Sequence, residues 1–268
     1  MFDIKMINNV VIVRFSLRIM KQWEEKAYGD EIHREDWYKY RADLFTRTLY
    51  CSLCHQTMPA AKVYLVCAEG DEPYYERYLG NTSCVPIFSN PKEFNLKILS
   101  HLKTNGITEN IAYSRIDSDD LISKHFLLKI SNAICSSSYD NHWFVATNGY
   151  RMNDGYIQKI YYNCSPFLTF FSKGIGTGGI YSINHEHVVQ HPHTLLTCSG
   201  LEWIQLIHAS NIGNAFVPKQ LEDEQFNEAI TSNPKQVAGK LKPIDADWFA
   251  SWAGFPLSLT YCRSKQER

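Results

Sequence analysis

Three carboxylates stand within four residues of one another in the stretch IAYSRIDSDD, at Asp117, Asp119 and Asp120. They follow a short apolar run at residues 111–113, which predicts a buried strand. Two like charges 4 Å apart repel by about 1 kcal/mol in water and about 4 kcal/mol near a protein surface. Side chains alternate along extended chain, so Asp117 and Asp119 would offer oxygens to one divalent cation, which would relieve the repulsion and bridge to a diphosphate.

The same acids also have a structural interpretation. Apolar residues at helical spacing predict a helix over residues 121–134. Asp119 and Asp120 at its start would stabilise the first turn through the helix dipole. The spacing alone leaves both interpretations open, because a short D-x-D-D string is common by chance.

Strands and helices are expected to alternate through the first half of the chain. Expected strands cover residues 10–15, 62–67, 85–88 and 111–113; expected helices cover residues 36–54, with Asp36 as N-cap, 72–79, 94–102 and 121–134. This alternation predicts an α/β fold with parallel strands. Ligands bind such sheets outside the carboxyl ends of the strands, and the three acids follow one of these ends.

The second half is expected to be richer in strands. Asn153-Asp154-Gly155 predicts a hairpin between residues 142–147 and 156–162. Strands over residues 167–171 and 180–183, a helix over 201–210 and a polar, loosely structured tail from Leu221 complete the expectation. We therefore predict a mixed sheet flanked by helices with a hairpin-rich second half, as one domain over residues 1–220 and a C-terminal extension over 221–268 that packs on it.

Composition argues against several classes of protein. The 268 residues carry a net charge of −1, which is not the basic footprint of a nucleic-acid-binding protein. No apolar run approaches the roughly 18 residues that a membrane-spanning helix needs. The first residues, MFDIKMINNVVIVRFSL, lack the pattern of a signal peptide, and the 8 Cys show no disulfide framework. We expect a cytoplasmic protein.

The RIDSDD string resembles the R-(L/I)-D-x-D-D motif of a family of bacterial rhamnosyltransferases with the glycosyltransferase A (GT-A) fold. Further matches follow in the same order: IVRFS near the start, DWYKYRADLF with the HQT before Pro59, and WIQLIHASN late in the chain. The resemblance spans residues 10–216. It implies a GT-A-like Rossmann-type sheet and the transfer of a sugar, with rhamnose as the candidate. The donor would be a dTDP- or UDP-sugar and the acceptor a glycan or a lipid-linked molecule.

The resemblance also implies roles for single residues. Asp117 would face the nucleotide ribose or the metal, and Asp119 would hold Mn²⁺ or Mg²⁺ on the diphosphate. His208 would be a third metal ligand, although a core histidine bonded to backbone is the alternative. Arg14 would contact base or phosphate with Phe15 packed nearby, or would pair with a local acid. The metal would act as a Lewis acid that neutralises charge on the departing nucleoside diphosphate.

Three further residues complete the expected site. Arg115 either holds the geometry of the acids or touches the donor. Inversion at the sugar needs a carboxylate that takes the proton of the acceptor hydroxyl, and Glu202 is the first candidate. Glu202 also ends an S-x-x-E string, SGLE, which is typical of a helix cap. Glu186 is the reserve candidate for this base.

Two alternatives to a transferase stay open. One is a metal-dependent phosphoester hydrolase in which the acids hold two metals and a histidine-rich stretch supplies ligands. That stretch, His185, His187, His191 and His193, matches no structural zinc pattern, and alternation would put His185 and His187 on one face, where one would line the donor cleft. The other alternative is a non-catalytic glycan-binding domain. A lipid-linked acceptor would place the protein at the inner face of a membrane as a peripheral protein.

Overall fold

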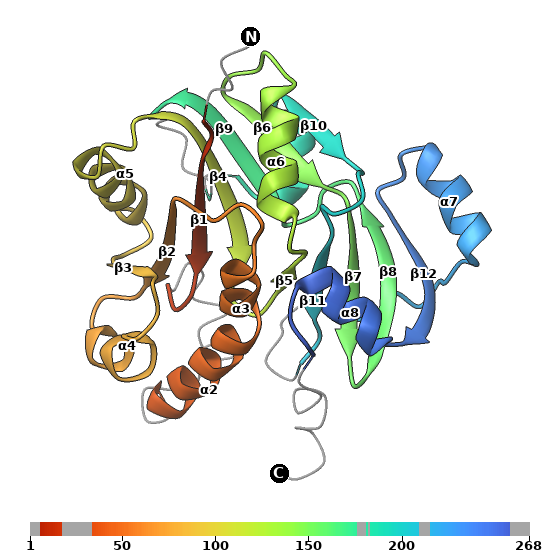
Figure 1. Cartoon of the computed structure of the whole chain (residues 1–268), viewed down its shortest axis with the longest axis horizontal. Coiled ribbons are helices and arrows are strands. Elements are labelled where there is room, and N and C mark those ends of the chain that lie inside the picture. The colour runs from red at the N-terminus through yellow and green to blue at the C-terminus, as the bar shows by residue number, and fades with distance from the viewer. Residues whose placement is uncertain (1–5, 18–33, 176–180, 182, 209–214, 258–268) are drawn as a thin grey trace.

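The computed structural model describes residues 6–17, 34–175, 181, 183–208 and 215–257 and contains two β-sheets (Figure 1). The strands of the first sheet are, in spatial order, β10 (His193–Leu196), β6 (His142–Ala146), β9 (Leu168–Gly174), β4 (Glu109–Asp117), β1 (Asn8–Arg14), β2 (Lys62–Cys67) and β3 (Val85–Phe88). Neighbouring strands from β4 to β3 are parallel, whereas β9 runs antiparallel to both β4 and β6. The prediction of a mixed α/β sheet is confirmed.

Helices cover both faces of this sheet. Val11 and Val13 of β1 belong to a core cluster that includes side chains of four helices, α2 (Arg34–Arg47), α3 (Leu49–Cys54), α4 (Glu72–Leu79) and α6 (Phe126–Cys135). Val10 and Ile12 point to the other face, where they pack with α5 (Phe94–Thr104). Alternate residues of β1 are therefore buried on opposite faces, which explains its continuous apolar run.

The second sheet explains the strand-rich second half of the chain. Its strands, in spatial order, are β12 (Gln236–Pro243), β8 (Tyr156–Tyr162), β7 (Asn148–Asn153), β11 (Trp203–Leu206) and β5 (Leu121–Ile122). Strands β7 and β8 form the predicted hairpin, in which Asp154 and Gly155 have φ angles of 50° and 78°, as a type I′ turn requires. The partner of β8 is β7, not residues 142–147, which form β6 of the first sheet.

Other expected elements also differ from the structure. Within the expected helix over 201–210, Trp203–Leu206 form strand β11, because these residues are buried on both sides between β7 and β5, and residues 209 and 210 lie outside the described residues. The expected helix over 121–134 starts later, since β5 precedes α6, and the helix over 36–54 is divided into α2 and α3, with Asp36 in the first turn rather than at the cap. Of the strand expected over residues 180–183, residues 180 and 182 lie outside the described residues, and Tyr181 and Ile183 are not in a strand.

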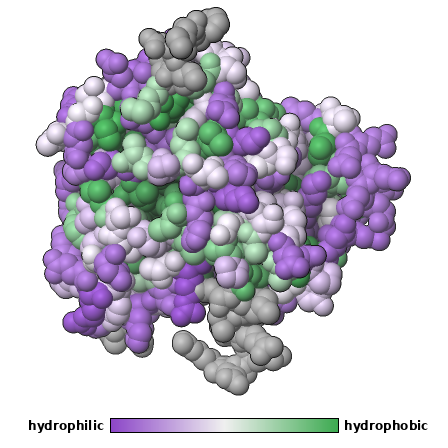
Figure 2. All heavy atoms as spheres, in the orientation of Figure 1, coloured by the Kyte–Doolittle hydropathy of each residue, from purple (hydrophilic) through white to green (hydrophobic). Residues whose placement is uncertain are grey.

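The described part of the tail, from Leu221 to Leu257, is ordered rather than loose. It forms α7 (Asp223–Thr231), β12 and α8 (Ala246–Ala253), and β12 pairs with β8. Phe249 and Ala253 of α8 are buried in a third cluster with apolar residues of the second sheet. Hydrophilic side chains gather over α7 in Figure 2. In the described part of the chain, every helix is too short or too polar to cross a bilayer.

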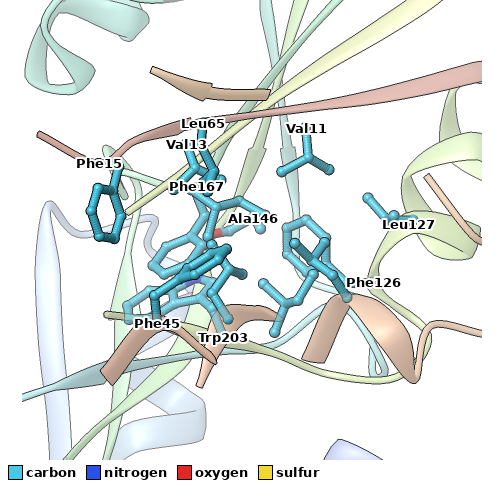
Figure 3. Close-up of a cluster of buried hydrophobic side chains, with 14 of the residues drawn as sticks. Val11, Val13, Phe15, Phe45, Leu65, Phe126, Leu127, Ala146, Phe167 and Trp203 are labelled. Atoms are coloured by element: carbon cyan, nitrogen blue, oxygen red, sulfur yellow. The ribbon is translucent and has the colours of Figure 1, made fainter. Parts of the chain in front are cut away.

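Trp203 of β11 joins the two sheets. Its fully buried ring stacks on Phe167 at a centroid distance of 4.7 Å, and its Nε1–H donates to the carbonyl of Ala146 at 2.7 Å (Figure 3). Gly149 of β7 lies directly opposite in the strand pairing. A Cβ atom on Gly149 would stand 2.1 Å from the indole ring, so only glycine leaves room for this packing.

We expect Gly149→Ala to lower the melting temperature by several degrees, because overpacking a core costs roughly 1–3 kcal/mol and the indole has no flexible end that could move aside. Thermal unfolding followed by circular dichroism measures this. Gly174→Ala is the matched control, since a Cβ there meets nothing within 4 Å. Equal melting temperatures for the two variants would contradict the packing described for Trp203.

Candidate functional site

The predicted acids lie at the carboxyl end of β4, beside the end of β1. Asp117 ends β4 and is the register partner of Arg14, which ends β1; the two arrowheads point the same way in Figure 1. Nη2 of Arg14 lies 3.8 Å from Oδ1 of Asp117, and the two side chains are 25% and 37% exposed. The structure therefore brings these two predicted residues together at the edge where open α/β sheets bind ligands.

Asp119 is buried between two basic side chains from distant segments. Its Oδ2 accepts a hydrogen bond from Nε2 of His208 at 2.7 Å, and its Oδ1 lies 3.3 Å from Nη2 of Arg41. The same Nη2 donates to Oγ of Ser118 at 2.6 Å. Burial works to raise the pKa of Asp119, but the charge of Arg41 and the hydrogen bond from His208 outweigh it, so the pKa lies well below its usual range.

His208 follows the end of β11, which explains how it reaches Asp119. Strand β11 pairs antiparallel with β5, so the end of β11 returns toward the acids that precede β5. The predicted pair of Asp119 and His208 is thus assembled in the structure. Arg41, by contrast, was not among the predicted site residues, although it stands within the DWYKYRADLF motif.

Asp120 is the most buried of the three acids, at 2% exposure. Burial and then the charges of Asp119 and Asp117 raise its pKa well above the usual value. Within the described part of the chain its Oδ1 is buried without a hydrogen-bond partner. Strand β5 follows Asp120 directly and the N-cap of α6 is His125, so the helix-capping interpretation of the acids is wrong.

A tyrosine that the sequence did not indicate lies between two arginines of the site. The Tyr181 ring is 5.7 Å from Cζ of Arg14 and 5.1 Å from Cζ of Arg115. Its hydroxyl donates to the carbonyl of Ile12 at 3.3 Å. Arg115 is 9% exposed, burial lowers its pKa, and its Nη1 donates to the carbonyl of Ile183 at 3.3 Å. These contacts favour the positioning alternative for Arg115.

Phe15 lies beneath the site rather than in it. It is 2% exposed and packs edge-on against Tyr38 and Phe45 of α2, at 5.1 Å and 5.9 Å between ring centroids. Phe15 was expected beside the bound nucleotide, and the structure places its ring in the core instead.

The two candidate bases are not assembled with Asp119. No helix starts at Glu202; its carboxylate accepts from the backbone N–H of Gly200 at 2.8 Å, just before β11. An extended strand rises about 3.3 Å per residue, so Glu202 and His208 lie near opposite ends of β11, well over 10 Å apart. Glu186 is exposed on the 3₁₀ helix η2 (His185–Gln190) and accepts from the Tyr162 hydroxyl at 3.2 Å. Neither makes a described hydrogen bond or ion pair with Asp119 or His208.

The histidine-rich stretch is not an extended strand, so alternation does not apply to it. His185 lies in η2, and its Nδ1–H donates to the carbonyl of Cys164 at 2.5 Å. Burial lowers the pKa of His185. In the ranges that the structure describes, no three His, Cys, Asp or Glu side chains are grouped so that they could hold a metal ion.

Asp119 and His208 nevertheless fit two positions of a divalent ion. Ligand atoms about 2.1 Å from an octahedral ion stand about 3 Å apart, close to the 2.7 Å between Oδ2 of Asp119 and Nε2 of His208. The partnerless Oδ1 of Asp120 adds an acceptor in the same region. Ions of this kind are commonly held by one or two carboxylates, with waters and substrate phosphates as the remaining ligands.

Comparison with known proteins assigns neither a family nor an activity. No family model and no curated protein matches the chain. Among solved structures, the inositol-1-phosphate CTP transferase from T. maritima is similar over 74% of this chain and 89% of that one, with 12% sequence identity and a TM-score of 0.36. A likeness at this level is too distant to define a shared fold family.

We expect Asp120→Asn to stabilise the protein at neutral pH. Unfolded Asp ionises near pH 3.9, whereas the raised pKa of Asp120 keeps the folded state from ionising there, so the wild type loses stability as pH rises above about 4. Each pKa unit is worth about 1.4 kcal/mol, or roughly 2–4 °C of melting temperature. Melting temperatures from pH 3 to pH 8 measure this: the variant should gain stability relative to the wild type only above about pH 4. A variant that is less stable at pH 7 would contradict the raised pKa of the buried Asp120 carboxyl.

Proposed function

We propose that the protein is a metal-dependent glycosyltransferase that moves a sugar from a dTDP- or UDP-sugar to a glycan or lipid-linked acceptor. One observation carries the proposal: Asp117 ends the central strand β4 and pairs with Arg14, and Asp119 follows it and is hydrogen-bonded to His208. This is the edge at which open α/β sheets bind nucleotides. The resemblance of RIDSDD to the rhamnosyltransferase motif adds rhamnose as the sugar that we propose.

The residues of the site divide into metal ligands and anion-binding groups. Asp119 and His208 would hold Mn²⁺ or Mg²⁺, with Asp117 at the ribose or as a further ligand. A bound ion of this kind supplies Lewis-acid stabilisation of the departing nucleoside diphosphate. Arg14, a quarter exposed, would contact the donor, while the Tyr181 ring, which also contacts Arg115, holds its guanidinium in place.

An apolar pocket of about 380 Å³ is lined by residues of β5 and β11, the strands that flank the acids and His208 in the sequence, and supports an acceptor with an apolar part. Leu121, which directly follows Asp120, and Leu206, at the end of β11, form one wall, and Phe249 of α8 and Phe255 form another. A lipid-linked acceptor that used this pocket would bring the protein to a membrane surface. The candidates for the base that inversion needs are Glu202, which accepts from the backbone N–H of Gly200, and Glu186, which is exposed and pairs with Lys235 at 3.3 Å.

We expect one nucleoside diphosphate from a panel of UDP, dTDP, GDP and CDP to raise the melting temperature, and to do so only with Mn²⁺. A ligand that binds the folded state alone adds about 2.7 kcal/mol at a hundred times its dissociation constant. Asp119→Asn should abolish the Mn²⁺-dependent part of the shift, because it removes a charged ligand of the ion. Differential scanning fluorimetry measures both effects.

Asp223→Asn is the control for this experiment. Asp223 is a surface carboxylate of α7 that pairs with Lys242 at 2.7 Å, so its loss should leave the nucleotide shift unchanged. Hydrolysis of the donor's diphosphate to a nucleoside monophosphate and a sugar phosphate, without sugar transfer, would favour the hydrolase instead. Glycan binding that survives Asp119→Asn, without any nucleotide shift in the wild type, would favour the glycan-binding module.

A further inference from the structure

Arg41 is a buried guanidinium with unused hydrogen-bonding capacity. Its side chain is 14% exposed, and one nitrogen, Nη2, serves both Ser118 and Asp119. Its Nε is buried and has no partner among the described residues. Burial works to lower the pKa of Arg41, but the ion pair with Asp119 outweighs it, so the group is a fixed positive charge. A guanidinium has five N–H donors in a planar fork, and Arg41 uses few of them.

A second arginine on the same helix face anchors α2 over the sheet. Arg34 precedes Arg41 by seven residues, or about two helical turns, so the two side chains leave α2 on the same side. Nη2 of Arg34 lies 2.5 Å from Oδ2 of Asp71, and Oγ of Ser16 donates to the same carboxylate at 2.5 Å. Ser16 and Asp71 follow β1 and β2, so this buried ion pair fixes α2 across the carboxyl ends of these strands and places Arg41 over the end of β4.

A cation bound to Asp119 and the guanidinium of Arg41 repel one another, so the two exclude each other from this carboxylate. A cation held by Asp119 and His208 would stand close to Nη2 of Arg41, which is only 3.3 Å from Oδ1. Like charges this close repel one another, and a divalent ion repels a guanidinium twice as strongly as a monovalent ion does. A diphosphate has the opposite effect, because a guanidinium binds its oxygens through two parallel N–H groups.

We propose that Arg41 is the counterion that Asp119 exchanges for a divalent cation, and that the released guanidinium binds the diphosphate of the donor. This inference rests on the proposed function. Arg41 neutralises Asp119 before the donor binds, so the site is not left with a bare buried carboxylate. The cation and the diphosphate then bind cooperatively, because the cation displaces Arg41 from Asp119 and the displaced guanidinium binds the diphosphate.

The exchange predicts opposite changes in two affinities when Arg41 is removed. In Arg41→Ala, Mn²⁺ alone should bind about 10-fold more tightly, because its competitor for Asp119 is gone. The nucleoside diphosphate that the wild type binds best should bind Arg41→Ala about 10- to 100-fold more weakly at saturating Mn²⁺. This is the loss expected when one or two charge-assisted hydrogen bonds are removed. Electron paramagnetic resonance of free Mn²⁺ and titration calorimetry of the nucleotide measure these affinities. A merely structural role would weaken both.

Two further variants keep the test decisive. Arg41→Lys retains the charge but lacks the planar fork of N–H donors, so its Mn²⁺ affinity should stay near wild type while its nucleotide affinity falls about 10-fold. If Arg41→Ala fails to fold, the result for Arg41→Lys decides the test. Lys39→Ala removes an exposed positive charge from the same helix and should change neither affinity. Suppose that the wild type binds nucleotide with Mn²⁺, but that Arg41→Ala loses affinity for both ligands or for neither. The proposed exchange is then wrong, while the proposal of a glycosyltransferase stands. A wild type that binds no nucleotide with Mn²⁺ overturns both.

Discussion

The carboxylate of Asp119, buried between Arg41 and His208, is the interaction on which the geometry of the candidate site depends. It joins helix α2, the segment between β4 and β5, and the end of β11, which are far apart in the sequence. Breaking a buried ion pair by removing one partner costs about 3–5 kcal/mol, because the other charge is left unpaired. Each of these segments is therefore held in place by the other two, and the site and the fold share the same contacts.

The second sheet is as necessary to this arrangement as the first. His208 reaches Asp119 because β11 runs antiparallel to β5, and the ring of Trp203 fixes this strand of the second sheet against the first sheet. Gly149 makes that packing possible by presenting no side chain to the indole. The close contact between Gly149 and Trp203 thus helps to determine the position of His208, which follows the other end of β11.

Local sequence patterns correctly predicted the elements whose structure is determined by their own residues. The β-branched run of β1, the turn at Asp154 and Gly155, and the acids after β4 were all placed correctly. Strand β11 was taken for a helix because a short apolar run has no periodicity of its own, and its partners, β7 and β5, lie more than 50 residues away. Arg41 and Tyr181 were missed for the same reason: only the fold brings them to the acids.

The crowding of acids that first suggested a metal has a different meaning in the structure. Arg14 pairs with Asp117, Arg41 and His208 with Asp119, and burial favours the neutral form of Asp120. The protein's own side chains therefore relieve the repulsion, and proximity of charges alone does not argue for a cation. The stronger argument for a bound ligand comes from the atoms that these pairings leave unsatisfied. An oxygen of Asp120 and the Nε of Arg41 are both buried without partners in the described chain. Buried polar atoms rarely stay unsatisfied, and in our proposals one would be an acceptor for a cation's shell and the other a donor for an oxyanion.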